Sequence, residues 1–477
     1  MNPKEFLDLI QGRSHNSPLV LCFGFEYSPV SNNQKDNTGA EILIKILSSK
    51  ILKKYTPFVV SQSAEWILSQ YNCIAITKKD LERKIGFEKT TFINYEFLCS
   101  ILSEVEMLSL RRSYLKEETR HNQRYFLIQK IRFWQYIFEN YLIKVYISSN
   151  VPHLLDDYIA YRFAKYYKIP TICAYRLPII TNCSSRLMLF ADPLNQSNPL
   201  PLVELMQSYK YNKLSQICDL WQIYQNCTIK KNHLSQLSYQ EERSNFINKE
   251  NNQKQLKTIK NIIKTFLKGW KRRIKTITNI KYYKTIKEDK VTKSQNIYDT
   301  LIKPIPEGYG YLYFPLHYQP EASSRPLGGL WADQELLVET IAEALPEDLY
   351  LCVKEHPLQI KKKANFRTVD FYEKIASKPK VFLVSDQINS EKLIEGAKGV
   401  ITLTGTVVFE AILKNKKCFV FGETPFQKGP GIVYPSSFQE LKNELYRLSI
   451  NDYPPITDEE ISHFLVWLGN HSVFGYL

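Results

Sequence analysis

The carboxy-terminal part of the chain alternates short apolar segments with helical patterns, and this alternation restricts the fold more than any other feature. The apolar segments are YGYLYFP, LYLCV, KVFLV, GVITL and KCFVFG, and segments with helical spacing of apolar residues, such as DQELLVETIAEAL, lie between them. Strands buried on both faces that alternate with helices form parallel sheets. Residues 301–455 are therefore predicted to form an α/β, doubly wound, Rossmann-like domain.

A second, less regular series of the same kind occupies the amino-terminal part. Its candidate strands are PLVLCFGF, TPFVV, NCIAIT, IKVYISS and PTICAY, and helical stretches such as residues 120–141 and 153–168 separate them. This series predicts another Rossmann-like domain over residues 1–190. A polar extension of helices or loops is expected over 191–248, and a helical tail over 456–477.

Most of the positive charge is confined to a predicted linker over residues 249–300. The chain of 477 residues has a formal net charge of +15, and residues 249–293 hold fifteen Lys and Arg but three acidic residues. Apolar residues recur at helical spacing there with lysines between them, which is typical of a basic amphipathic helix over 257–277. Such a helix either binds an anionic membrane surface or packs on the protein, and both interpretations stay open. Nucleic acid is not expected as a partner, because no binding motif accompanies the charge.

The expected location is the cytoplasm, with peripheral attachment to the inner face of the cell membrane if the basic helix binds lipid. The sequence has no recognisable signal peptide and no apolar run of about 18 residues, the length that spans a bilayer. Its nine cysteines are scattered without a C-x-x-C pair, which favours reduced, mostly buried thiols over disulfides or a zinc site.

Candidate ligand-binding residues follow the strands of the carboxy-terminal domain, because doubly wound sheets bind ligands beyond the carboxyl ends of their strands. The polar segments there are HYQPEASSRP (317–326), KEHP (354–357), SDQINS (385–390) and TGT (404–406). Pro357 is expected to hold His356 extended and to prevent a helix from beginning there. A histidine fixed in this way can donate a hydrogen bond to a phosphate, although a bond to a neighbouring backbone carbonyl is the alternative.

The segment TGT is the second candidate for binding an anion. Gly405 permits close approach of the backbone, and Thr406 is predicted to begin a helix whose amino-terminal amides attract negative charge. Glu410, about one turn further on, is a candidate partner of a ribose hydroxyl. An ordinary N-cap threonine and a solvent-facing glutamate would give the same pattern. Arg325 is a weaker candidate, because a surface arginine is the more common interpretation.

Three segments, YFPLHYQPEASS, KEHP and GVITLTGTVVFEAILKNKKCFVFG, resemble the carboxy-terminal domain of bacterial capsular polysaccharide biosynthesis proteins. These are GT-B-type glycosyltransferases related to the capsule Kdo transferases. The resemblance covers residues 305–425 well and the amino-terminal half only loosely. It implies two Rossmann-like domains facing across a cleft, a nucleotide-activated sugar held by the carboxy-terminal domain, and no requirement for a metal.

The resemblance also extends to individual residues. Relatives that use CMP-activated acidic sugars have a His-Pro pair and a later Ser/Thr pair around the cytidine phosphate. His356 and Pro357 match the first pair. The second pair is split here, because Gly405 lies between Thr404 and Thr406. The family also has a Gln-Pro feature after the first strand, which Gln319 and Pro320 match. The split pair makes cytidine a less secure expectation than a nucleotide in general.

No Asp-x-Asp pair is present, which agrees with a reaction that needs no metal and no cofactor beyond the nucleotide-sugar co-substrate. Protein donors would then have to stabilise the negative charge of the leaving group. The His356 side chain, the amides of Gly405 and Thr406, and the Arg325 guanidinium are the candidates.

The base that activates the acceptor hydroxyl is expected on the amino-terminal domain. Glu26 ends the first strand, and a helix predicted to begin near Pro152 has three ionisable residues in its first turns, His153, Asp156 and Asp157. Aspartates in a first turn also complement the helix dipole, so this pattern has a second interpretation. The polar loop 23–42 offers Asp36, Asn37 and Gly39 for contact with the acceptor, although a surface loop has the same composition.

The sequence thus predicts a glycosyltransferase that moves a sugar from a nucleotide donor, most simply a CMP-sugar, onto a polysaccharide or glycolipid acceptor of the capsule or another surface polymer. A CDP-dependent polyol-phosphate transferase and a non-catalytic scaffold of a capsule assembly complex are the alternatives. A sugar epimerase of the same architecture is less expected, because the basic linker would have no role in it.

Overall fold

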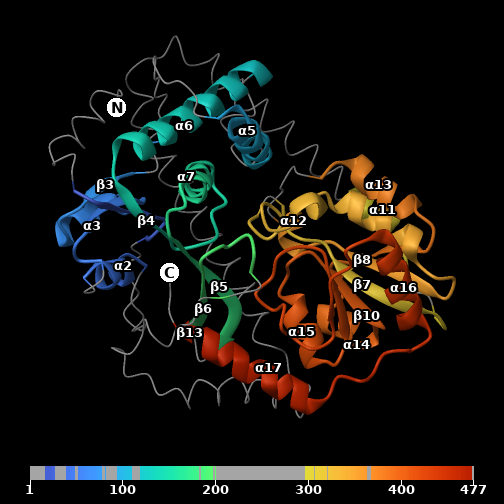
Figure 1. The fold of residues 1–477 in the computed structure, drawn as a ribbon. Coiled ribbons are helices and arrows are strands. Elements are labelled where there is room, and N and C mark those ends of the chain that lie inside the picture. The colour runs from blue at the N-terminus through green and yellow to red at the C-terminus, as the bar shows by residue number, and fades with distance from the viewer. Residues whose placement is uncertain are drawn as a thin grey trace, which may run out of the picture.

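The computed structural model describes residues 17–26, 39–48, 52–77, 81, 94–109, 119–181, 184–196, 199, 296–305, 307–319, 321–361 and 367–474. Within these ranges the chain forms two α/β domains, each built on one sheet (Figure 1). The predicted amphipathic helix over 257–277, the two acceptor candidates Asp36 and Asn37, and Pro320 lie outside the described residues.

The sheet of the amino-terminal domain has seven strands in the order β13-β6-β5-β4-β1-β2-β3. Five of them are parallel, namely β1 (Leu19–Phe23), β2 (Thr56–Val60), β3 (Ile74–Ile76), β4 (Ile143–Ser148) and β5 (Thr171–Thr181). The strands β6 (Ser184–Phe190) and β13 (Val473–Phe474) extend the sheet in antiparallel fashion. The order of the parallel strands reverses between β1 and β4, which makes the crevice beyond these two strands the expected ligand site.

Helices cover both faces of this sheet because alternate residues of a strand point to opposite faces. Leu19, Leu21 and Phe23 of β1 belong to the core under the helices α5 (Tyr95–Ser109), α6 (Arg120–Asn140) and α7 (Leu155–Tyr166). Val20 and Cys22 belong to the opposite core, under α2 (Gly39–Leu47) and α3 (Ala64–Gln70). The fully buried side chain of Trp134 anchors α6 in the first core. Both layers are visible in Figure 1.

The sheet of the carboxy-terminal domain has six strands in the order β12-β11-β10-β7-β8-β9, and every pair is parallel. Its strands are β7 (Gly310–Pro315), β8 (Leu349–Lys354), β9 (Val381–Val384), β10 (Gly399–Thr402), β11 (Lys417–Val420) and β12 (Ile432–Val433). This is the strand order of dinucleotide-binding doubly wound sheets, with its reversal between β7 and β10. The predicted pair of Rossmann-like domains, the GT-B arrangement, is confirmed.

Some helices of this domain begin where a capping side chain accepts a hydrogen bond from an amide of the first turn. Asp333 accepts from Leu336 N at 3.4 Å at the start of α11 (Gln334–Ala344), and Asn389 accepts from Glu391 N at 2.8 Å before α14 (Ser390–Gly396). The remaining helices are η2 (Gly329–Ala332), α12 (Pro357–Lys361), α13 (Val369–Ser377), α15 (Val407–Leu413) and α16 (Phe438–Ser449).

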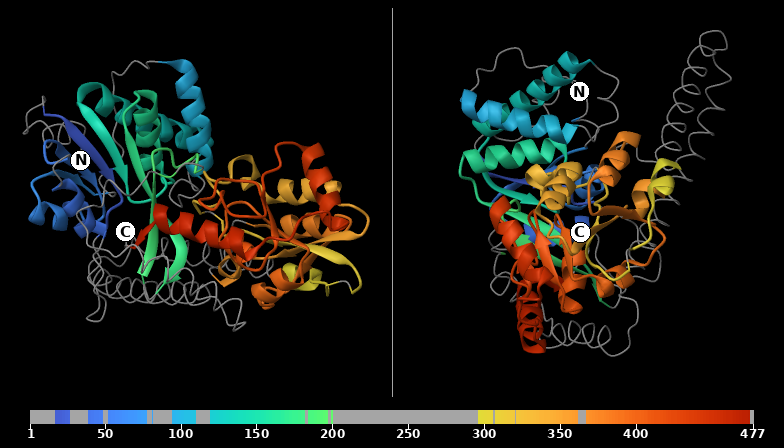
Figure 2. Two further views of the ribbon diagram at one scale, coloured as in Figure 1. Left: turned by 60° about the horizontal axis from the view of Figure 1, so that its bottom comes forward. Right: turned by 90° about the vertical axis from the view of Figure 1, so that its right-hand side faces the viewer.

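The end of the chain returns to the amino-terminal domain. Helix α17 (Asp458–His471) starts in a capping box at Thr457 and leads from one domain to the other, where β13 pairs with β6 (Figures 1 and 2). Phe464 and Leu468 of this helix pack in one apolar cluster with Met188 of β6 and with the core of the carboxy-terminal domain. The predicted helical tail is thus part of the link between the two domains.

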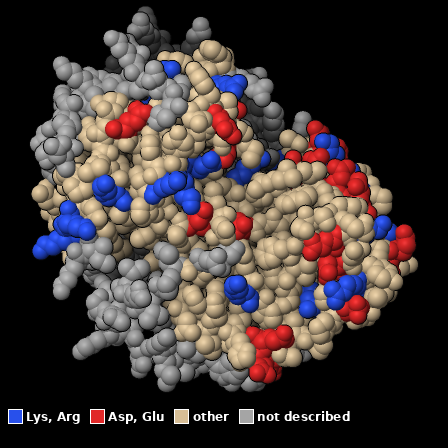
Figure 3. Space-filling view, viewed as in Figure 1, with Lys and Arg blue, Asp and Glu red and all other residues tan. Residues whose placement is uncertain are grey.

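The described surface carries both signs of charge on both domains in the face shown in Figure 3. The sequence places most of the excess positive charge in residues 249–293, outside the described residues. Among the described helices, none combines the length and the apolar character needed to cross a membrane.

Candidate functional site

His356 lies at the carboxyl end of β8, and the backbone that follows it fixes its ring. The amide of Leu358 donates to His356 Nδ1 at 3.1 Å. In the neutral ring the proton is therefore on Nε2, which makes Nε2–H a donor. Pro357 is the first residue of helix α12, so the expectation that it would prevent a helix from beginning there was wrong. Proline suits the first helical position, because an amide hydrogen there has no partner within the helix.

A second histidine, His317, lies at the carboxyl end of β7 beside the point where the strand order reverses. Its Nε2 accepts from Thr404 N at 3.3 Å, which leaves the proton of the neutral ring on Nδ1. The residue is 7% exposed, and within the described part of the chain Nδ1 has no hydrogen-bond partner. Burial, with a smaller contribution from His356, lowers the pKa of His317 to about 3, so the ring is neutral.

Sequence reasoning selected the segment that contains His317 but gave this residue no role. The signal that singled out His356, a histidine directly after a buried strand, applies to His317 as well. The two strands are neighbours in the sheet, and Pro315 of β7 is paired with Lys354 of β8. The sheet therefore brings both histidines to the same edge.

The segment TGT packs directly on His317. Thr404 Oγ1 donates to Ser323 O at 2.7 Å, and the Gly405 amide donates to Thr402 Oγ1 at 3.2 Å. A Cβ atom on Gly405 would lie 3.0 Å from both His317 Nε2 and Thr402 Oγ1, so close packing within the protein already calls for glycine here. A phosphate would have to compete with Thr402 for the Gly405 amide. Thr406 is the N-cap of α15, as predicted, and its side chain makes no capping hydrogen bond.

Glu410, on α15, is half-buried and interacts electrostatically with a buried ionisable residue, Lys354 at the end of β8. Burial first, and then the charge of Glu391, raise the pKa of Glu410 to about 7. Burial lowers the pKa of Lys354 to about 8, and its ammonium donates to Ile388 O and, at 3.1 Å, to Ser390 Oγ. A carboxyl group with its pKa raised in this way can, when protonated, both donate to and accept from a hydroxyl group.

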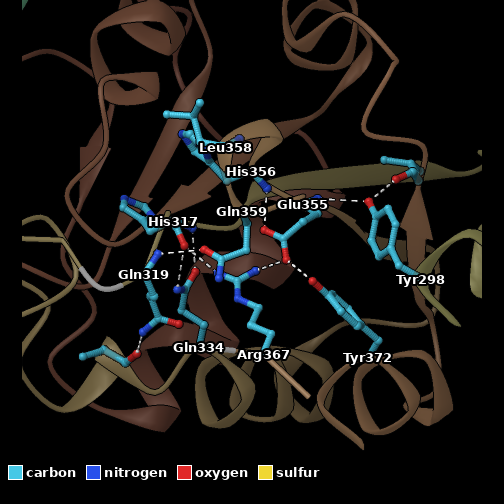
Figure 4. A network of polar contacts seen from close by, with 12 residues as sticks. Tyr298, His317, Gln319, Gln334, Glu355, His356, Leu358, Gln359, Arg367 and Tyr372 are labelled. Atoms are coloured by element: carbon cyan, nitrogen blue, oxygen red, sulfur yellow. Dashed lines mark hydrogen bonds and ion pairs between the residues drawn. The ribbon is translucent and has the colours of Figure 1, made fainter. Parts of the chain in front are cut away.

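Gln319 has a structural role in the polar network of Figure 4. Its side chain donates to Ala332 O at 2.7 Å, and its amide donates to Gln359 Oε1 at 2.9 Å. Arg325 lies in the same loop and reaches the other domain, where its Nη1 is 3.5 Å from Met107 O at the end of α5. Burial lowers the pKa of Arg325.

The carboxyl edge of the carboxy-terminal sheet is turned towards the amino-terminal domain. The loop after β7 makes the Arg325 contact, and the loop after β11 makes another, from Gln196 N to Glu423 Oε2 at 3.0 Å. Figure 1 shows α12, which follows His356, on the side of its domain that faces α7. Residues after β7 and β11 therefore lie at the boundary between the domains.

A pocket of about 220 Å³ opens in the amino-terminal domain beyond β1 and β4, the point where this sheet reverses its strand order. Gly24 lines it with φ at +85°, and a Cβ atom there would lie 2.6 Å from Ser149 Oγ. The other residues that line the pocket are Phe23, Val60, Leu81, Ser148, Ser149, Asn150, His153, Leu154, Asp156 and Asp157.

His153 lines this pocket in the tautomer that a general base needs. Its Nδ1 is 2.6 Å from Val151 O, and since a carbonyl only accepts, Nδ1 carries the proton and Nε2 is the acceptor of the neutral ring. The predicted helix was placed slightly too early, because α7 begins at Leu155 and His153 precedes it.

Asp156 was the alternative base, but the structure gives its carboxylate a buried structural partner. Lys130 Nζ of α6 lies 3.2 Å and 3.3 Å from its two oxygens, and Trp134 Nε1 donates to it at 3.1 Å. The side chains of Lys130 and Asp156 are 4% and 12% exposed. Asp156 therefore neutralises a buried ammonium, and a base role would disrupt that pair.

The prediction that Glu26 ends the first strand was wrong, because β1 ends at Phe23 and Glu26 follows three residues later; Glu26 is also not among the residues that line the pocket. Its Oε2 accepts from Gln62 N at 2.9 Å and from Ser61 Oγ at 3.1 Å, which fixes the loop between β2 and α3. Among these two base candidates, His153 lines the pocket and Glu26 does not. No group of three His, Cys, Asp or Glu side chains suited to a metal ion occurs within the described ranges.

Comparison with known proteins gives one family and several distant structures. Residues 226–450 match the family of capsule polysaccharide biosynthesis proteins. The chain is similar to the beta Kdo 2,7 transferase structure of Thermosulfurimonas dismutans KpsC, with 12% identity, a TM-score of 0.31 and coverage of 74% of this chain and 97% of that one. It is also similar to the UDP-GlcNAc 2-epimerase of Methanocaldococcus jannaschii, with 10% identity, a TM-score of 0.26 and coverage of 94% and 99%.

No curated protein sequence matches the chain. The family match includes the segments that carry His317, His356 and Thr404, and the resemblance found in the sequence is confirmed there. Over residues 226–450 the chain is similar to the capsule polysaccharide biosynthesis protein family.

Proposed function

We propose that the protein is a glycosyltransferase that moves a sugar from a CMP-linked donor onto a capsular or other surface polysaccharide or its glycolipid precursor. The observation that carries this proposal is the fixed ring of His356, whose Nε2–H is a donor at the carboxyl edge of a sheet with dinucleotide-binding strand order. The family match of residues 226–450 supports the capsular context.

On the donor side, His356 donates to the phosphate as the bond to the sugar breaks and negative charge develops on the leaving group. The amino-terminal end of α15, which begins after Thr406, attracts the same charge. Glu410 binds a ribose hydroxyl through its carboxyl group. These groups supply the stabilisation that a divalent ion supplies in other transferases, so the proposed reaction needs no metal.

On the acceptor side, His153 Nε2 takes the proton of the acceptor hydroxyl, whose oxygen then attacks the anomeric carbon. The new bond to carbon forms as the bond to the nucleotide breaks, and direct displacement inverts the configuration at that carbon. The acceptor polymer grows at the inner face of the cell membrane, and the basic residues 257–277 attach the enzyme to its anionic lipids.

A thermal-shift screen of the purified protein against CMP, CDP, UDP, GDP and their common sugar conjugates tests the donor class. A ligand at 100 times its Kd stabilises the native state by about 2.7 kcal/mol. We expect stabilisation by CMP that is weakened in His356→Ala and unchanged in His463→Ala, a matched control at an exposed position of α17.

Two other outcomes would point elsewhere. Selective stabilisation by CDP would favour transfer of a polyol phosphate, which forms a phosphodiester in place of a glycosidic bond. No stabilisation by any nucleotide would contradict the proposal and favour a scaffold role.

A further inference from the structure

One buried carboxylate is bonded to the residue that carries the proposed phosphate donor. Glu355 is 1% exposed, and its Oε1 accepts from the backbone amide of His356 at 2.5 Å. Its Oε2 pairs with the Arg367 guanidinium and accepts from the Tyr372 hydroxyl at 2.6 Å (Figure 4). The Glu355 amide donates to the Tyr298 hydroxyl at 3.1 Å. The side chain of Glu355 and its backbone are thus both fixed.

The cation of this pair reaches the second histidine. Arg367 Nη2 donates to the backbone carbonyl of His317 at 2.5 Å, while Nη1 faces Glu355. Gln334 also holds His317, since its side chain accepts from His317 N at 2.7 Å and donates to His317 O at 3.2 Å. A single guanidinium therefore connects the backbone of His317 with the side chain of Glu355, just beyond the ends of two neighbouring strands.

Stability alone is a weak reason for this arrangement. Burying two charges costs several kcal/mol, and a buried ion pair often contributes no more than well-packed apolar residues of similar volume. What the planar guanidinium adds is geometry, because its donors lie in a fixed fork and bond two acceptors at set angles. Both acceptors here belong to the chain immediately around a strand-end histidine.

We propose that Glu355 and Arg367 are positioning residues that hold His317 and His356 in one fixed arrangement at the edge of the sheet. The effect of this arrangement on ligand binding rests on the proposed function, in which this edge of the sheet binds the phosphate of a nucleotide. The arrangement of the two histidines does not depend on that function. His356 is held on two sides, by Glu355 at its amide and by Leu358 at Nδ1. A disturbance of the ion pair then reaches the His356 ring through its own backbone.

The test uses Tyr372→Phe, which removes one hydrogen bond to Glu355 with little change of volume, and Arg367→Lys, which keeps the charge but loses the planar fork. The control is Tyr311→Phe, because the Tyr311 hydroxyl is also buried in this domain but donates to Leu393 O at 2.9 Å, in another part of the fold. If Arg367→Lys does not fold, Tyr372→Phe remains decisive.

The first readout needs no ligand. The ring ¹⁵N signals of His356, assigned with His356→Ala, report its tautomer in the full-length protein. We expect the Nε2–H tautomer in the wild type and in Tyr311→Phe, and exchange between tautomers in Tyr372→Phe and Arg367→Lys. A His356 spectrum that is identical in all four proteins would overturn the proposal.

The second readout is the Kd of CMP. Loss of one buried hydrogen bond in Tyr372→Phe should weaken CMP binding about fivefold. When His356→Ala is already present, Tyr372→Phe should weaken CMP binding by less than about twofold, because its effect acts through His356. If Tyr372→Phe weakened CMP binding equally in the presence and in the absence of the His356 side chain, the proposed positioning role would be contradicted. If the wild type binds no CMP but the ring signals change as expected, the proposed function fails and the positioning role stands.

Discussion

Replacement of Asp156 by Asn should destabilise the amino-terminal domain strongly, because it would leave the buried ammonium of Lys130 without its counter-charge. The two groups are 3.2 Å apart, and their side chains are 4% and 12% exposed. Their Coulomb attraction at an effective dielectric constant of 20 is about 5 kcal/mol. Breaking a buried pair by removing one charge costs about 3–5 kcal/mol.

We expect the lower end of this range, about 3 kcal/mol, since Asn still accepts the hydrogen bond from Trp134. For a domain of about 200 residues this corresponds to a decrease in Tm of about 6–12 °C. Calorimetry or circular dichroism follows the melt. Glu106→Gln is a matched control, because it makes the same carboxyl-to-amide change at an exposed pair with Arg124 and should cost less than about 1 kcal/mol.

The double variant Lys130→Met with Asp156→Asn, which keeps an acceptor for Trp134, separates the loss of a pair from the loss of a catalytic group. It removes both charges, and its stability should recover to within about 1 kcal/mol of the wild type. An Asp156→Asn protein that is as stable as the wild type but has lost transferase activity would refute this reasoning. It would make Asp156 a catalytic carboxylate after all.

Three further predictions concern the two sites. Gly405→Ala should cost about 1–3 kcal/mol in urea unfolding, because its methyl group would lie 3.0 Å from His317 Nε2, and an unchanged midpoint would contradict the packing described here. The pKa of Glu410 is raised from 4.5 to about 7, so the wild type should lose stability relative to Glu410→Gln as pH rises from 4.5 through 7. If the free energies of unfolding of the two proteins changed in parallel with pH, this carboxyl group would ionise normally in the folded protein. His153→Ala should lower kcat by at least about 100-fold without weakening CMP binding, whereas normal turnover would exclude His153 as the base.

Much of the strand and helix pattern could be predicted from the sequence, because buried parallel strands are short apolar runs that differ clearly from amphipathic helices. The segment YGYLYFP became β7, and DQELLVETIAEAL became α11. Strand β13 could not be predicted in this way. It is two residues long, and only its pairing with β6, which lies far earlier in the sequence, makes it a strand.

The candidate sites were harder to predict because their contacts join distant elements. Lys130 meets Asp156 through the packing of α6 on α7, and nothing in the spacing of the two residues signals an ion pair. Arg367 joins His317 to Glu355 in the same way. His356 was found because strand order brings strand ends to one edge, and that rule depends on the sequence pattern alone.

The central claim is that the edge of the carboxy-terminal sheet near His356 binds a nucleotide, and a crystal structure of the full-length protein with CMP tests it most directly. We predict the CMP phosphate within hydrogen-bond distance of His356 Nε2, near the amino-terminal end of α15, with the ribose beside Glu410. CMP bound in the pocket lined by Gly24 and His153, with the edge near His356 unoccupied, would contradict the assignment of the donor site.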